Sequence, residues 1–192
     1  MHRLYQLLSS LVILVFAPTL LAGQNNAIVL FGYGGRDLPL SNLNETGDHF
    51  GSDWVVGGGV GLQLNTNFAV RGTFSTVNSG WEGTSIELSD STFRRSFVAF
   101  DLQAGVPTAS GFVPYFVVGA GWFSIEPKDP DLEGDRSFAG RFGAGVNYVF
   151  DNTFMAFFLE GDTWIYYVDG LSYSRIQYDI MIVGGIAIAI PF

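Results

Sequence analysis

Large apolar residues alternate with small or polar ones through segment 138–150, and this period of two leaves few folds open to the chain. Phe138, Phe142 and Tyr148 occupy even positions, whereas Arg141 and Asn147 lie among glycines at odd positions. Successive side chains of a β-strand point to opposite faces of its sheet. The pattern therefore predicts a strand with one apolar face and one small, polar face.

Seven further segments extend this interpretation to an all-β chain. Segments 68–76, 97–106 and 154–165 repeat the alternation, and glycine-rich apolar segments lie near 27–35, 54–64, 113–123 and 178–192. In 113–123 and 178–192 both faces are largely apolar, so the pattern assigns their sides only weakly. Prolines fall in the connections or at strand ends, where they interrupt no hydrogen-bond ladder. The sequence predicts eight strands.

The connections between these segments alternate in length. Long connections are predicted at 36–53, 77–95, 124–137 and 167–177, and short ones at 65–67, 107–112 and 151–152. Regular alternation is typical of an up-and-down barrel in a membrane, because its two rims face different compartments. We therefore expect an eight-stranded antiparallel up-and-down transmembrane β-barrel.

Composition excludes several other classes. After residue 22 the chain has no run of 18 apolar residues, which argues against membrane-spanning helices. Nine Lys and Arg against eighteen Asp and Glu make nucleic acid an improbable partner. Cysteine is absent, which excludes disulfides, a thiol nucleophile and Cys-ligated metal sites.

The side of the barrel that faces lipid follows from where the charges fall. A lipocalin-like barrel would place its apolar face inside, whereas an outer-membrane barrel places it outside. The few charged strand residues here share a face with the glycines, and small residues suit the narrow interior of eight strands. Aromatic residues gather near predicted strand ends, as in interfacial girdles: Trp54, Trp122, Phe123, Trp164, Tyr166 and Tyr167 toward the long loops, and Tyr148, Phe150 and Phe154 toward the short turns. We expect an outer-membrane barrel.

Two short turns predict strand register. A two-residue turn at Asp151–Asn152 would place Arg141 opposite Asp162 and Gly143 opposite Glu160. A three-residue turn at 65–67 would place Gly61 opposite Arg71. In both hairpins, glycine would leave room for a charged side chain.

Residues 1–23 have the parts of a secretory signal peptide: a basic start at Arg3, an apolar stretch and small residues at Ala22 and Gly23. Removal of this segment would leave residues 24–192 as a single barrel domain.

The strand pattern of residues 24–192 resembles the small eight-stranded outer-membrane barrels of Gram-negative bacteria, of the OmpA/OmpX type. The most specific element is segment 186–192, where alternating apolar residues end in Phe192, like the terminal signal read by the outer-membrane assembly machinery. Pro191 departs from that pattern. The resemblance implies an integral outer-membrane protein at the cell surface, in contact with outer-membrane lipids and lipopolysaccharide. We expect a monomer without a cofactor.

The resemblance implies a structural or surface-interaction role, with envelope integrity, adhesion or recognition carried by the outer loops. A narrow channel for small or hydrophobic solutes is the alternative. The inward-facing charges bear on this choice, because they could form either a buried ion-pair plug or an ion path. We favour a plug, since an eight-stranded lumen is filled by side chains. The charged residues concerned are Arg71, Asp101, Arg141, Glu160 and Asp162.

Two loop patterns are candidate sites of other chemistry. Asp129, Asp131, Glu133 and Asp135 resemble the first half of an EF-hand loop, but position twelve is Gly140, so a solvated acidic loop is the simpler interpretation.

A lipid A-modifying acyltransferase is a further alternative. Lipid A palmitoyltransferases carry a loop His and a later Asp-Ser pair, and this chain has His49, Asp90 and Ser91 in predicted long loops. No amphipathic helix precedes the first strand, and the flanking residues show no further match. We expect no enzymatic activity.

Overall fold

The computed structural model describes residues 26–43, 47–83, 92–129, 134–150, 154–170 and 173–192. These residues form nine strands: β1 (Ala27–Pro39), β2 (His49–Phe50), β3 (Asp53–Gln63), β4 (Phe68–Glu82), β5 (Thr92–Gly105), β6 (Phe112–Pro127), β7 (Asp135–Val149), β8 (Met155–Gly170) and β9 (Tyr173–Pro191). In the described part of the chain, no helix is long and apolar enough to cross a membrane.

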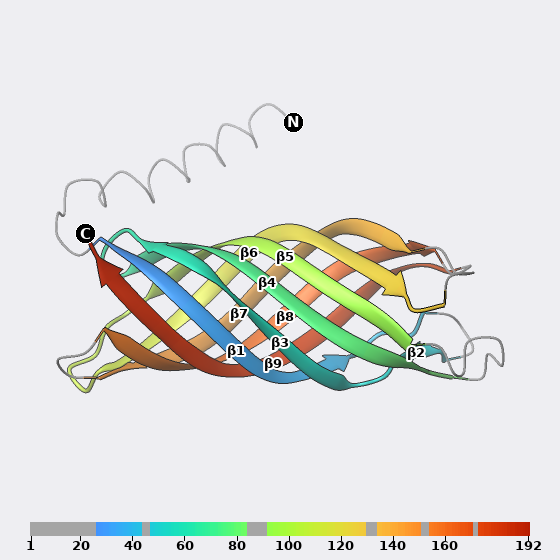
Figure 1. The fold of residues 1–192 in the computed structure, drawn as a ribbon, viewed down its shortest axis with the longest axis horizontal. Helices are drawn as coiled ribbons and strands as arrows, with labels where there is room; N and C mark the ends of the chain where they lie inside the picture. Colours follow the sequence, from blue (N-terminus) through green and yellow to red (C-terminus); the bar gives the residue numbers. More distant parts are fainter. Residues whose placement is uncertain (1–25, 44–46, 84–91, 130–133, 151–153, 171–172) are drawn as a thin grey trace, which may run out of the picture.

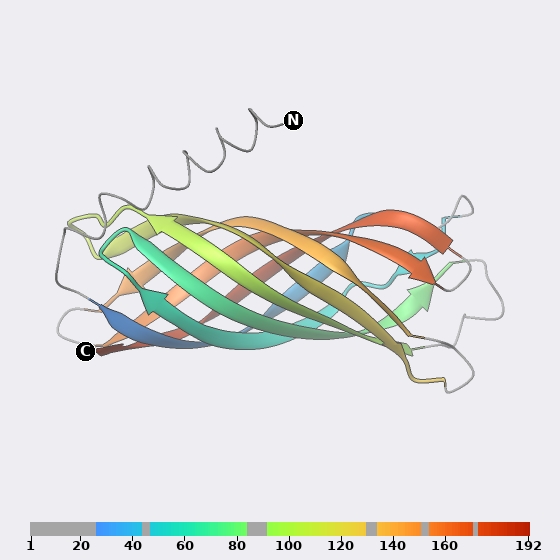
Figure 2. The same cartoon turned by 90° about the horizontal axis from the view of Figure 1, so that it is seen from above.

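Eight of the strands close into a barrel. Each long strand pairs antiparallel with the next, and β1 pairs with both β3 and β9. Figures 1 and 2 show the start of β1 beside the end of β9 at one end of the barrel, the short-turn end, while the end of β4 lies at the opposite, long-loop end. The two-residue β2 extends the edge of β4 at the long-loop end. The predicted eight-stranded antiparallel barrel is confirmed.

The two faces of the wall differ as the alternation predicts. Large apolar side chains such as Phe116, Phe138 and Phe100 are 65–74% exposed on the outside. Charged and small side chains of the same strands point into the lumen, where Asp101 and Arg141 are buried. This outward belt of phenylalanine, valine and isoleucine is the kind of surface that the hydrocarbon chains of a membrane cover.

The strands continue further toward the long-loop end than the sequence predicts. β4 runs to Glu82, β5 begins at Thr92 and β7 begins at Asp135, so the predicted boundaries of the long loops were wrong. Near these ends the outward positions become polar, as at Asn78 and Ser96. Because apolar alternation stops while backbone pairing continues, the sequence pattern marks the apolar belt and not the full strand.

The register of β7 and β8 also differs from the prediction. Gly143 lies opposite Asp162, and Arg141 lies opposite Trp164, which is a shift of two residues. The connection is longer than a two-residue turn, because the Phe150 amide donates a hydrogen bond to the Met155 carbonyl (3.3 Å). A two-residue shift leaves every side chain on its expected face. The predicted pairing of Gly61 with Arg71 is confirmed.

The aromatic girdle is smaller than the sequence predicts. Trp54, Trp122 and Tyr167 face outward at the long-loop end, and Tyr148 and Phe154 do so at the short-turn end. The assignment of three other aromatic residues to the girdle was wrong, because they occupy inward positions of their strands and are at most 2% exposed: Phe123, Trp164 and Tyr166.

Candidate functional site

A charged cluster crosses the middle of the lumen. This central charged cluster contains the five charged residues predicted to face inward, namely Arg71, Asp101, Arg141, Glu160 and Asp162. Arg71 donates two hydrogen bonds to Glu160, at 2.8 and 3.2 Å, and lies 3.7 Å from Asp101. Arg141 reaches three carboxylates, at 2.6 Å from Asp101, 2.5 Å from Glu160 and 2.8 Å from Asp162. The structure therefore brings all five side chains into one network.

Strand pairing and glycine together place this cluster. Arg71 and Asp101 lie directly opposite each other on β4 and β5. A side chain at Gly119 or Gly143 would overlap the carboxylates of Asp101 and Asp162, respectively. Glycine at these positions gives the carboxylates room to turn toward the barrel axis.

A second charged cluster, which the sequence analysis missed, lies nearer the long-loop end. This rim charged cluster consists of Arg95, Asp37 and Asp179, all at most 1% exposed. Arg95 pairs with Asp37 and donates to Asp179 at 2.5 Å. Its guanidinium also donates to Ser79 (2.7 Å), and the Tyr166 hydroxyl donates to Asp179 (2.9 Å).

The rim charged cluster was missed because two of its members were assigned to loops. Asp37 was placed in loop 36–53 and Arg95 in loop 77–95, whereas Asp179 lies in a segment whose faces the pattern assigned weakly. The sequence did contain one usable signal. Arg95 and Asp101 are six residues apart, an even number, so on one strand both side chains point to the same face. Extending the period of two into the polar segments would have found it.

Between the two charged clusters lies an aromatic layer, defined by Phe97, Phe123, Trp164 and Tyr166. The Phe123 and Tyr166 rings stack with centroids 4.0 Å apart, and Phe97 lies 4.9 Å from Trp164. The Arg141 guanidinium carbon lies 5.3 Å from the Trp164 ring centroid. The layer thus contacts both charged clusters, through Trp164 to Arg141 and through the Tyr166 hydroxyl to Asp179.

At the long-loop end, an apolar cap covers the lumen. The cap consists of Leu43, Phe50, Trp81 and Phe93, each at most 5% exposed. Phe50 lies 6.1 Å from Trp81 and 6.0 Å from Phe93 between ring centroids. The strand pairing of β2 with β4 holds Phe50 in place, and the Arg95 guanidinium carbon lies 4.7 Å from its ring centroid.

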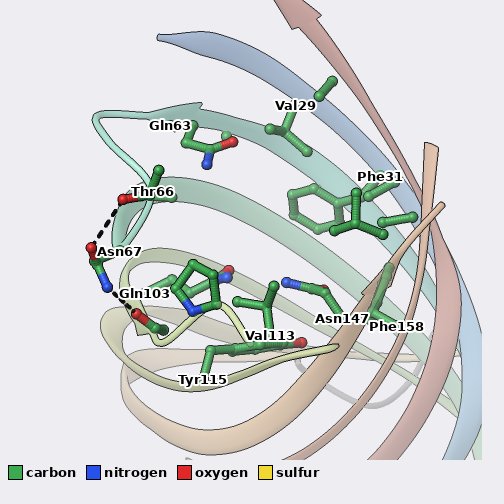
Figure 3. A pocket seen from close by; sticks show the side chains of 18 of the residues that line it. Val29, Phe31, Gln63, Thr66, Asn67, Gln103, Val113, Tyr115, Asn147 and Phe158 are labelled. Atoms are coloured by element: carbon green, nitrogen blue, oxygen red, sulfur yellow. Dashed lines mark hydrogen bonds between the residues drawn. The ribbon is translucent and has the colours of Figure 1, made fainter. Parts of the chain in front are cut away.

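The short-turn end is hollow instead of filled. A cavity of about 450 Å³, the basal cavity, lies between the short turns and the central charged cluster. Figure 3 shows Gln63, Gln103 and Asn147 around this space, with Phe31 and Phe158 beside it. Arg71 and Tyr115 also line it.

Comparison with known families decides the class of this barrel. The outer membrane protein beta-barrel domain family matches residues 9–178. The chain belongs to this family. It is therefore an integral protein of the bacterial outer membrane, and its short-turn end faces the periplasm while its long loops face outward.

Solved structures share the fold of this outer-membrane barrel at low sequence identity. Neisserial surface protein A is 10% identical, with 84% of this chain and 96% of that chain covered and a TM-score of 0.63. The N-terminal β-barrel domain of Pseudomonas aeruginosa OprF is 15% identical, with 86% and 99% covered and a TM-score of 0.55. Pseudomonas aeruginosa OprG is 14% identical, with 88% and 96% covered and a TM-score of 0.52. No curated protein matches the chain in sequence.

The remaining candidate sites of the outer-membrane barrel are described only in part. Asp131 and Glu133 lie outside the described residues, and the described residues contain no group of three or more His, Cys, Asp or Glu that could hold a metal. His49 is described, but Asp90 and Ser91 are not. The His49 ring nitrogens lie 2.9 Å from the Gly47 carbonyl oxygen and 3.3 Å from Glu82. The predicted signal peptide, residues 1–23, also lies outside the described residues.

Proposed function

We propose that this protein is a closed, non-conducting outer-membrane barrel that serves envelope integrity or surface interaction through its outer loops. The observation that supports a closed barrel is the packing of the lumen from the outer mouth to its middle. The cap, the rim charged cluster, the aromatic layer and the central charged cluster follow one another from the outer mouth to the middle of the barrel. The side chains of Arg95 and Arg141 are 0% and 1% exposed, and each pairs with buried carboxylates. Such buried ion pairs support a closed lumen and not a water-filled path lined by charges.

The distribution of positive charge supports contact with lipopolysaccharide and other outer-leaflet lipids. Outside the lumen, the described cationic side chains all lie toward the long-loop end: Arg36, Arg94, Lys128, Arg136 and Arg175. Arg36 and Arg136 lie over the exposed rings of Trp54 and Trp122, with distances of 5.4 and 5.8 Å to the ring centroids. Cations beside interfacial aromatics suit lipid phosphates at the membrane surface.

The proposal extends to the parts of the chain outside the lumen. Phe192 is 74% exposed at the end of β9, where the assembly machinery could read it. Residues 1–23 would be removed on export, and the barrel would act as a monomer. We assign it no acyltransferase activity, because the described contacts of His49 are the Gly47 carbonyl and the Glu82 carboxylate, and neither is a hydroxyl nucleophile. Incubation with lipid A followed by mass spectrometry should show no acyl transfer.

Planar-bilayer recording tests whether the lumen is closed. The folded protein should give no conductance steps, because four packed layers block the path. Steps that persist in the pure folded barrel would instead support the narrow channel. A variant with Phe50→Ala and Arg95→Ala together should also stay closed, because the aromatic layer and the central charged cluster remain.

Complementation separates the two roles. A strain that lacks the gene should become sensitive to detergent if the barrel supports the envelope. A variant in which residues 84–91 are replaced by a Gly-Ser linker keeps the described strands. Rescue by this variant would assign the role to the barrel, whereas rescue by the unaltered protein alone would assign it to the loop. No sensitivity in the deletion strain would contradict a role in envelope integrity.

A further inference from the structure

The basal cavity has the properties of a small-molecule site. Its volume of about 450 Å³ lies within the range of about 300–1,000 Å³ that is common for ligand pockets. Its walls are largely apolar, with Val29, Val113 and Ala156 among them. Such pockets bind by apolar contact and use a few polar groups to orient the ligand.

Two buried hydrogen-bond donors at this cavity lack a well-aligned partner. The Nε of Arg71 forms no hydrogen bond within the described residues, and the Tyr115 hydroxyl lies beside the Glu160 carboxylate without a well-aligned hydrogen bond to it. Tyr115 is 2% exposed and Arg71 is 7% exposed, and both line the cavity. The Arg71 guanidinium carbon lies 5.9 Å from the Tyr115 ring centroid, so the two side chains lie side by side in the cavity wall. Because buried donors are normally paired, an acceptor atom from outside the chain would stabilise them.

Charge limits what that acceptor can be. The central charged cluster contains two guanidinium groups and three carboxylates, so one negative charge is in excess when all are ionised. A ligand carboxylate would add a second uncompensated charge in a buried site, which is unfavourable. A ligand ammonium group carries only hydrogen-bond donors, so it cannot accept from the Nε of Arg71. An uncharged acceptor such as a carbonyl oxygen avoids both conflicts.

We propose that the basal cavity binds a small uncharged molecule that carries a carbonyl-type acceptor beside an apolar ring, and that the molecule comes from the periplasmic side. The acceptor lies against Tyr115 and Arg71, and the ring packs against the aromatic side chains of Phe31 and Phe158. The carboxamides of Gln103 and Asn147 line the same cavity and offer further polar contacts nearer the opening.

Methyl NMR of the full mature barrel in lipid nanodiscs tests this site with three ring-matched probes. Benzamide should cause saturable shifts at the valine methyls of Val29 and Val113. The lipid-facing methyls of Val60 and Val118 report partition into the bilayer and should not follow the same curve. Benzoate and benzylammonium should bind at least about tenfold more weakly than benzamide, because each brings a charge.

Two pairs of variants locate the binding. Ala156→Phe fills the cavity and should abolish the saturable shifts, whereas Ala144→Phe on the outer face should leave them intact. Tyr115→Phe keeps the ring but removes the hydroxyl, so benzamide should bind about three- to tenfold more weakly. Tyr148→Phe on the lipid side is the matched control. The proposal is overturned by shifts that do not saturate, by benzoate binding as tightly as benzamide, or by undiminished binding to Ala156→Phe and Tyr115→Phe.

Discussion

At the scale of single residues, the charges of the lumen depend on one another. Arg141 contacts three carboxylates from β5 and β8, all at 2.8 Å or less. Arg141→Ala would leave Arg71 alone to compensate three buried acids. We expect the free energy of unfolding to fall by about 3–5 kcal/mol, since a buried charge that loses its partner is not resolvated.

Urea titration of the refolded barrel, followed by tryptophan fluorescence, measures this loss. Arg94→Ala removes an exposed arginine of β5 and should change stability by less than about 0.5 kcal/mol. Equal stabilities of the two variants would refute a structural role for the central charged cluster.

Glycines of the lumen differ in how strictly they are needed. A methyl group at Gly143 would meet the Asp162 carboxylate and lie 2.7 Å from the Gly161 carbonyl oxygen. At Gly61 the nearest atom, Cγ of Arg71, would be 3.5 Å away, an ordinary van der Waals contact. Gly143→Ala should therefore destabilise the barrel by about 1–3 kcal/mol through overpacking. Gly61→Ala should leave stability unchanged or raised, and thermal unfolding of both variants side by side gives the comparison.

At the scale of elements, the cap is held by a strand of two residues. Phe50 is 1% exposed, and the Gly51 amide donates a hydrogen bond to the Gly80 carbonyl at 2.9 Å. Phe50→Ala removes the ring between Trp81 and Phe93. We expect local opening of the cap while the barrel stays folded, because the long strands pair independently of β2.

Amide hydrogen exchange measures the opening. Exchange at Gly51 and Leu43 should accelerate at least about tenfold in Phe50→Ala, which corresponds to about 1.4 kcal/mol of lost local stability. Leu40→Ala alters a side chain that is 63% exposed and should leave both rates unchanged. Accelerated exchange throughout β4 and β5 would mean that the cap and the barrel unfold as one unit.

The same elements show how far the sequence could predict this structure. Strand number, order and faces follow from alternation, because outward residues such as Phe138 and Phe142 must meet lipid. Strand ends do not follow, since the lipid constraint ends before backbone pairing does. The rim charged cluster lay in those extensions, and β2 is too short to show any period. The register of β7 and β8 depended on a turn length that Asp151 and Asn152 suggested wrongly.

At the scale of the whole molecule, the wall is longer than its apolar belt. On β5 the outward residues are Phe100 and Leu102 near the short-turn end but Arg94 and Ser96 near the long-loop end. Figure 2 shows the strands continuing as one barrel along this whole length. The polar outer part of the wall, together with the cap, therefore forms a rigid base for the outer loops above the membrane.

This division of the wall predicts that a charge is tolerated according to its depth. Phe100 is 65% exposed and lies opposite Gly72 and Ala120 within the apolar belt. Ser96, four residues along the same strand, lies opposite Thr76 and Ser124. In lipid vesicles, Phe100→Arg should lower the free energy of unfolding by about 2–4 kcal/mol, whereas Ser96→Arg should lower it by about 0–1 kcal/mol. Urea titrations of the two variants in the same vesicles measure the difference, and Phe100→Leu controls for loss of the ring. If Ser96→Arg were as costly as Phe100→Arg, Ser96 would lie within the hydrocarbon layer, and the barrel would not project beyond the membrane at β5.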